Sequence, residues 1–155
     1  MSSVCLSDMP SRSSIINESR SHHCLIFDAS NVVTFNARSL KNKLTELQYL
    51  LYNVFDTVDV ICITETWLSS SITNSMIDPL SQFNIYRRDR ITKTTGGGVC
   101  ILIHKKLNVV EVQISREFGL IECVCIDILC CFDSTIRLFN VYIDPVERQR
   151  RIFLS

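Results

Sequence analysis

Three stretches of the chain are largely apolar at successive positions and not only at alternate ones, and this limits how the chain can fold. They are residues 58–63, 99–104 and 120–129. A strand with one face in water alternates apolar and polar side chains, whereas a strand buried on both faces is apolar along most of its length. We therefore expect strands of sheets that are covered on both faces. A single sheet with a single helix cannot cover them, so the sequence predicts a layered fold.

The first half of the chain has the pattern of a strand, a helix and a second strand. The first strand is indicated by Val32, Val33 and Phe35. It ends at Asn36, and residues 58–63 form a second strand that leads to Glu65. Between them, apolar residues recur at three- and four-residue steps, as on one face of a helix: Leu40, Leu44, Leu47, Leu51 and Val54. Ser39 is expected to cap this helix, and the whole unit predicts the α/β class.

The second half of the chain predicts a β-meander. Besides residues 99–104 and 120–129, strand-like runs occupy residues 83–90, 109–114 and 136–142. Between two of these runs stand Gly96, Gly97 and Gly98. Three glycines can cradle a phosphate, but neither a Lys-Ser/Thr pair nor a helical pattern follows them. We expect them to form a hairpin loop or to allow a close approach of two backbone segments.

With 155 residues, 46% of them hydrophobic and 21% charged, the chain has the size and composition of one domain. Residues 1–23 are rich in serine and lack periodicity, so we expect a disordered leader followed by a domain over residues 24–155. The start lacks the apolar segment of a secretion signal, and no uncharged apolar run approaches the ~18 residues of a membrane span. We therefore expect an intracellular protein, nuclear or cytoplasmic, that does not enter a membrane.

Eight cysteines raise the question of disulfides or a zinc site. A reducing compartment disfavours disulfides. The tightest group is Cys123, Cys125, Cys130 and Cys131. It has neither paired C-x-x-C spacing nor a nearby histidine, so it does not resemble a zinc site. We expect Cys62, Cys100, Cys123 and Cys125 to pack in the core as small hydrophobic residues.

Charge alone does not select a partner, because sixteen basic residues balance sixteen acidic ones. Anion binding therefore has to come from local placement. Arg87, Arg88 and Arg90 form one basic cluster, and residues 148–151 hold a second. Such short runs can equally be solvated charges at the ends of strands and helices.

Asn36 and Glu65 are the candidate metal ligands. Each follows a strand of the strand-helix-strand unit, and parallel strands end at the same edge of a sheet. Magnesium sites combine one or two carboxylates with water and substrate oxygens, and an asparagine carbonyl oxygen can share the ion. Position alone leaves open that Glu65 caps a turn or a helix.

Four motifs follow one another along the chain: FNARSL (35–40), ICITETWL (61–68), YRRDR (86–90) with GGGVCILI (96–103), and FNVYIDP (139–145). In this order they resemble the endonuclease/exonuclease/phosphatase superfamily, and most closely the apurinic-type endonuclease domain of non-LTR retrotransposons. The resemblance runs from about Asn31 to Pro145. It implies a four-layered α/β sandwich and Mg²⁺-dependent hydrolysis of a DNA phosphodiester, which nicks the target for reverse transcription.

The resemblance also implies roles for particular residues. Asn36 matches the asparagine near the metal and the attacked phosphate, and Glu65 matches the Mg²⁺ ligand. Tyr142 matches a tyrosine that contacts the scissile phosphate. The implied partner is DNA, for which the candidate contacts are Arg38, Arg87, Arg88 and Arg90. No small-molecule cofactor is expected.

The sequence departs from the family pattern in two ways. The arginine that usually follows the tyrosine directly is missing, because Ile143 stands at that position. The GDFN-type motif, which places the nucleophilic water, and the SDH-type motif, which supplies the catalytic His-Asp pair, do not occur in the 155 residues. We therefore expect a partial sandwich that ends before its second sheet is complete, folds poorly alone and does not nick DNA measurably, since one acid–base group alone is worth ~10²–10⁴ in rate.

Two other functions remain open from the sequence. One is a non-catalytic module that binds nucleic acid or protein. The other is a phosphatase or phosphodiesterase of the same superfamily that acts on a small substrate.

Overall fold

A computed structural model describes residues 31–54, 57–90, 96–114, 121–130 and 133–143. The elements, in chain order, are β1 (Val32–Asn36), a 3₁₀ turn (Leu40–Lys43), α1 (Leu44–Val54), β2 (Val60–Thr64), α2 (Asn74–Ile77), β3 (Phe83–Arg88), β4 (Val99–His104), β5 (Val109–Glu111), β6 (Glu122–Leu129) and β7 (Thr135–Tyr142). The predicted leader, residues 1–23, lies outside the described part. No described helix is both long and apolar enough to cross a membrane.

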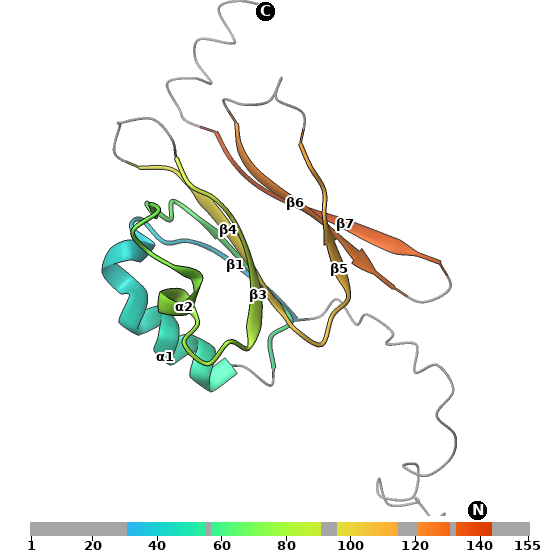
Figure 1. The fold of residues 1–155 in the computed structure, drawn as a ribbon, viewed down its shortest axis with the longest axis horizontal. Helices are drawn as coiled ribbons and strands as arrows, with labels where there is room; N and C mark the ends of the chain where they lie inside the picture. Colours follow the sequence, from blue (N-terminus) through green and yellow to red (C-terminus); the bar gives the residue numbers. More distant parts are fainter. Residues whose placement is uncertain (1–30, 55–56, 91–95, 115–120, 131–132, 144–155) are drawn as a thin grey trace, which may run out of the picture.

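The strands form two sheets that face each other (Figure 1). The first has the order β1-β2-β4-β3, and the second has the order β5-β6-β7. β1 and β2 are parallel, because α1 carries the chain back between them, whereas the other neighbours are antiparallel. Figure 1 shows α1 and α2 on one face of the first sheet and the second sheet on its other face. The predicted α/β class with two facing sheets is confirmed.

Each face of the first sheet has its own core. Alternate residues of β2 separate the two: Ile61 and Ile63 pack toward the helices, and Val60 and Cys62 pack toward the second sheet. The helix-side core also contains Leu40, Leu47, Leu51, Ile77, Phe83, Cys100 and Leu102. The core between the sheets contains Val99, Ile101, Ile103, Val124, Ile126 and Ile128. β2 and β4, which are apolar at successive positions, are therefore covered on both faces, as predicted, whereas β6 contributes one face to a core and leaves Leu129 on its other face exposed.

The amphipathic helix forms, but it begins differently from the prediction. Leu47 and Leu51 are buried and Leu44 is partly buried, so the apolar face is confirmed, while the side chain of Val54 lies outside the described part. Ser39 has a left-handed backbone (φ 81°) and makes no capping hydrogen bond with its side chain. Ser39 therefore stands at the predicted N-cap position of the helical segment, but its side chain does not cap it. A 3₁₀ turn precedes α1, and the Ser39 N–H is bound to the Glu65 carbonyl after the neighbouring strand.

The cysteines of the described strands lie in the interior. Cys62, Cys100, Cys123 and Cys125 are buried and free, and Cys130 is half-buried and free. Packing of the first four as small hydrophobic residues is confirmed. Burial raises the pKa of the Cys62 thiol to about 11, so this thiol is neutral at physiological pH.

Candidate functional site

Glu65 follows the last residue of β2 and stands between two other segments of backbone. Its backbone is left-handed (φ 55°), and its carbonyl oxygen accepts a hydrogen bond from the Ser39 N–H at 2.9 Å. On the other side, the Trp67 N–H donates to the Gly97 carbonyl at 3.0 Å. The end of β2 is thus fixed by the segment after β1 and by the glycine loop before β4.

The Glu65 carboxylate is held in a defined orientation. Its Oε2 accepts hydrogen bonds from Trp67 Nε1 at 2.7 Å and from the Gly97 N–H at 2.9 Å. Partial burial alone raises the pKa of Glu65, but hydrogen bonds from Tyr142, Trp67 and Gly97 and the charge of Arg90 outweigh burial, and the pKa is lowered. The group is therefore an anion near neutral pH.

Tyr142 reaches Glu65 from the second sheet. It is the last residue of β7, and its side chain hydrogen-bonds the Glu65 carboxylate. The structure therefore brings together two of the three residues that the sequence marks as site residues, although they belong to different sheets. The end of β7 lies beside Glu65 because β7 stacks over β2 and β4. The buried Asn140 fixes that stacking by donating to the carbonyls of Ile63 and Cys100, both at 2.9 Å.

Asn36 ends β1 beside the end of β2. It is in register with Thr64, the residue before Glu65. Phe35 packs toward the helices, and Asn36 lines with it a hollow of about 180 Å³ beside the start of the helix. The Asn36 side chain is exposed, and its Oδ1 accepts a hydrogen bond from the Arg38 N–H at 3.0 Å.

The three glycines allow the close approach that the sequence suggests. All three have positive φ, between 74° and 99°. A Cβ on Gly97 would lie 2.5 Å from Glu122 Oε2, and one on Gly98 would overlap Thr66 Oγ1. Side chains at these positions would therefore push the loop away from Glu65.

Glu122 is a residue of the site that the sequence did not single out. Its carboxylate accepts from Arg90 Nε and from the Gly98 N–H, both at 2.6 Å. The side chains of Glu122 and Arg90 are only 13% and 11% exposed. The sequence feature that could have pointed to Glu122 is its position as a charged residue inside the apolar run 120–129.

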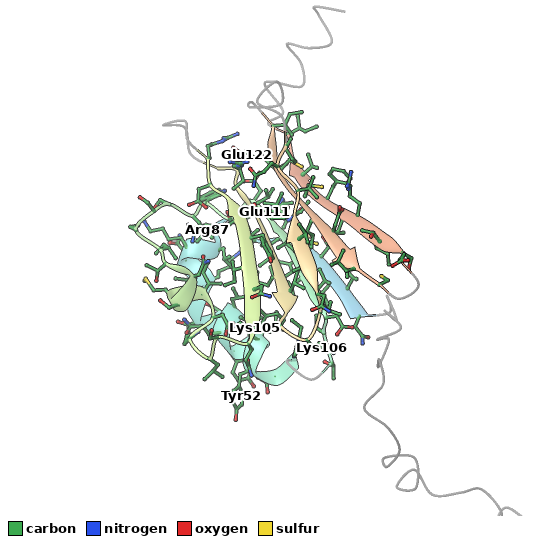
Figure 2. All side chains as sticks on the ribbon, turned by 45° about the vertical axis from the view of Figure 1, so that its right-hand side comes forward. Tyr52, Arg87, Lys105, Lys106, Glu111 and Glu122 are labelled. Carbon is green, nitrogen blue, oxygen red and sulfur yellow. The ribbon has the colours of Figure 1, made fainter. Side chains whose placement is uncertain are left out.

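The four arginines predicted to contact nucleic acid lie in different environments. The Arg87 guanidinium is bound by Asp89 and by the carbonyls of Ser69 and Ile72. Arg90 pairs with Glu122, and its guanidinium carbon lies 5.9 Å from the centre of the Tyr142 ring. Arg38 and Arg88 are exposed. Figure 2 shows Arg87 on the outer side of the first sheet.

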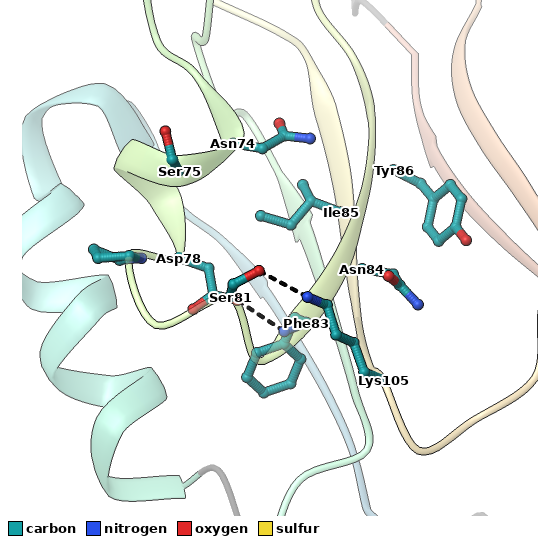
Figure 3. A pocket seen from close by; sticks show the side chains of 10 residues that line it. Asn74, Ser75, Asp78, Ser81, Phe83, Asn84, Ile85, Tyr86 and Lys105 are labelled. Atoms are coloured by element: carbon teal, nitrogen blue, oxygen red, sulfur yellow. Dashed lines mark hydrogen bonds between the residues drawn. The ribbon is translucent and has the colours of Figure 1, made fainter.

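Two other features lie away from these strand ends. His104, the one histidine among the described residues, is at the opposite end of β4, where its ring packs edge-on against Phe83. A hollow of about 390 Å³ opens beside β3 and α2 and is lined by residues that include Asp78, Ser81 and Lys105 (Figure 3). None of the residues predicted for the site lines it.

Comparison with known proteins shows which solved structures have a similar fold. No family model and no curated protein matches the chain. Among solved structures, the catalytic domain of Xenopus laevis APE2 has a TM-score of 0.53 and 18% identity over 79% of this chain and 48% of its own. The AP endonuclease LMAP from Leishmania major has a TM-score of 0.55 and 18% identity over 76% of this chain and 42% of its own.

The likeness to the endonuclease domain of TRAS1, a telomere-specific non-LTR retrotransposon, has a TM-score of 0.47 at 15% identity, too low to decide between branches of the fold. The chain spans less than half the length of the two AP endonucleases. Over the matched part, the two facing sheets and their helices have the fold of AP endonucleases, which is the endonuclease/exonuclease/phosphatase fold that the sequence motifs indicate.

Proposed function

We propose that the chain contributes part of a Mg²⁺-dependent site for hydrolysing phosphodiester bonds in DNA. In this proposal Glu65 and Asn36 hold the metal, and Asn36 and Tyr142 face the phosphate. One observation carries it: an ionised carboxylate at the end of a parallel strand pair is contacted by a tyrosine of the facing sheet, in a chain with the fold of AP endonucleases.

The donor atoms fit magnesium. Mg²⁺ prefers oxygen ligands and keeps several waters, so one carboxylate and one amide oxygen suffice on the protein side. The described residues contain no group of three or more His, Cys, Asp and Glu side chains that could hold a metal, so water and substrate oxygens would have to complete the site. When bound, the ion would polarise the phosphoryl oxygens.

The surroundings suit a polyanionic substrate. Arg38 and Lys41 are exposed on the segment that follows Asn36. Cations placed there attract the DNA backbone and position it without reading sequence. Tyr142 can donate its phenolic hydrogen to a phosphate oxygen in place of Glu65.

We further propose that these 155 residues alone do not cleave DNA. The GDFN-type and SDH-type motifs do not occur in the sequence, and His104 lies at the far end of its strand from Glu65. Incubation of supercoiled plasmid with the chain and Mg²⁺ should give no more nicked product than plasmid alone. Mg²⁺-dependent nicking that Glu65→Ala abolishes would contradict this part of the proposal and leave the metal site standing.

Metal binding can be tested apart from activity, because Trp67 is the only tryptophan of the chain and its indole hydrogen-bonds Glu65. Titration with MgCl₂ should change the tryptophan emission of the native chain. The response should survive in Glu111→Gln, which removes an exposed carboxylate from β5, and vanish in Glu65→Gln. No Mg²⁺ response in the native chain, or an equal response in Glu65→Gln, would refute the metal site.

A second candidate function, non-catalytic binding of nucleic acid, is favoured by the exposed Arg38 and Arg88. In that case the chain would retain DNA in a salt-sensitive way. Retention would survive Glu65→Ala and be lost when Arg38 and Arg88 are both replaced by alanine.

A further inference from the structure

We propose that Arg90 and Glu122 are positioning residues that hold the glycine loop and Tyr142 against Glu65. The pair joins the loop before β4, in the first sheet, to the first residue of β6, in the second sheet. Its importance for metal binding rests on the proposed function, whereas its effect on the geometry around Glu65 does not.

The two oxygens of Glu122 bind different partners. Oε1 accepts from Arg90 Nε and Oε2 from the Gly98 N–H, both at 2.6 Å. The next N–H along the loop, that of Gly97, donates to Glu65 Oε2 at 2.9 Å. Glu122 therefore anchors the loop one residue away from the point at which the loop binds Glu65.

The same pair also reaches Tyr142. Glu122 and Tyr142 are opposite each other in the β6–β7 register, and the Arg90 guanidinium lies 5.9 Å from the centre of the Tyr142 ring. Tyr142 in turn hydrogen-bonds Glu65. Two of the groups that orient the Glu65 carboxylate, the Gly97 N–H and the Tyr142 side chain, are thus placed by one ion pair.

The burial of the pair argues for a role in geometry. Both side chains are at most 13% exposed. Removing two charges from water offsets much of their attraction, so a buried ion pair is weak evidence for stability, and an apolar pair of similar volume often serves stability as well. In this proposal the pair, through its hydrogen bonds on two sides, fixes an arrangement that apolar side chains would leave loose. Groups that orient a metal ligand in this way commonly change metal affinity 10–100-fold.

The test compares three variants of the full chain by MgCl₂ titration of Trp67 emission. Glu122→Ala removes the anchor and should weaken Mg²⁺ binding by about 10-fold or more. Glu122→Gln keeps the side-chain length but has no charge and one acceptor oxygen in place of two, so its Mg²⁺ affinity should lie between those of the native chain and Glu122→Ala. Asp127→Ala is the control: it breaks the Asp127–Arg137 ion pair, which joins β6 to β7 away from the site, and should leave Mg²⁺ affinity unchanged.

Quenching of Trp67 by acrylamide, measured without metal, separates the possible failures. Glu122→Ala should make Trp67 easier to quench, and Asp127→Ala should not. If quenching follows this pattern but the native chain does not bind Mg²⁺, the positioning role stands and the metal site fails. Two results would refute the positioning role while the metal site stands. In one, Glu122→Ala behaves like the native chain in quenching and in Mg²⁺ affinity. In the other, Glu122→Gln loses as much Mg²⁺ affinity as Glu122→Ala. Circular dichroism of each variant confirms that folded proteins are compared.

Discussion

At the scale of single residues, the site depends on positions where a side chain cannot be tolerated. Gly98 has φ 83°, and a Cβ there would overlap the buried Thr66 side chain. Left-handed backbone is costly for residues with a Cβ, and here a steric clash adds to it. Gly96 also has positive φ, but its added Cβ would meet nothing closer than 3.5 Å. Substitutions at Gly98 and at Gly96 can therefore be compared to separate the cost of the steric clash from the cost of a left-handed backbone.

We expect Gly98→Ala to lower the free energy of unfolding by about 1–3 kcal/mol, and by more than Gly96→Ala does. Urea denaturation followed by circular dichroism measures both variants. Equal losses in the two variants would show that the backbone conformation alone, and not the contact with Thr66, requires glycine at position 98.

Residue-scale electrostatics also predicts a dependence on pH. The pKa of Asp127 lies below its usual value. The main cause is the hydrogen bond from Arg137, and the positive charge of Arg137 adds to it; together they outweigh the opposing effect of desolvation. The folded-state pKa is lower than that of the unfolded chain, so the stabilisation is present above the unfolded-state pKa and is lost as pH falls through the folded-state pKa. The melting temperature of Asp127→Asn should therefore fall less than that of the native chain as pH is lowered from 5 to 3. The difference should be small, because Arg137 is exposed to solvent.

At the scale of elements, one asparagine sets how the second sheet lies on the first. Asn140 is buried in β7 and donates to a carbonyl of β2 and to a carbonyl of β4. Asn140→Ala leaves both carbonyls without this partner, so we expect a loss of about 1–3 kcal/mol in unfolding free energy. Asn84→Ala, at a half-buried position on β3, is the control and should lose less. A loss in Asn140→Ala no greater than that in Asn84→Ala would mean that apolar packing alone sets the arrangement of the sheets.

Most elements could be predicted from local sequence, because periodicity is a local property. Residues 99–103 are apolar throughout, and the strand β4 occupies Val99–His104. The start of α1 could not be predicted from Ser39, because the backbone of that residue is bound to Glu65, a contact with a neighbouring strand. Local sequence indicates which residues can cap a helix, and tertiary contacts decide whether they do so.

The candidate site was predictable only in part for the same reason. Glu65 and Asn36 could be proposed from the sequence because each follows a strand of one local unit. The role of Glu122 depends on the β6–β7 register and on the approach of the glycine loop from the other sheet, and neither is visible in a short stretch of sequence. Arg87 looked free in the sequence, but backbone carbonyls 15 and 18 positions away bind it.

At the scale of the whole molecule, the described strands leave two edges open on the same flank. β1 and β7 each pair with one neighbour among the described strands, and both carry exposed apolar side chains. Examples are Val32 and Val33 on β1 and Phe139 and Val141 on β7. Open edges with apolar side chains and few charges promote pairing between molecules.

We therefore expect the isolated chain to self-associate as its concentration rises, which light scattering or gel filtration can follow. Phe139→Lys should reduce the association, because a charge on an edge strand opposes pairing between chains. Ser70→Lys, at an exposed turn outside the edge strands, adds the same charge and should leave the association unchanged. A chain that stays monomeric at high concentration would show that these edges are protected.

The burial of Cys100 has a consequence for how the molecule can be followed over time. Its thiol has no exposed surface, and burial raises its pKa to about 12. Only a thiolate reacts with an alkylating reagent, so Cys100 does not react until the helices that cover this face of the first sheet separate from it. The rate at which iodoacetamide labels Cys100 under native conditions, measured by mass spectrometry, would therefore report how often the protein's interior opens.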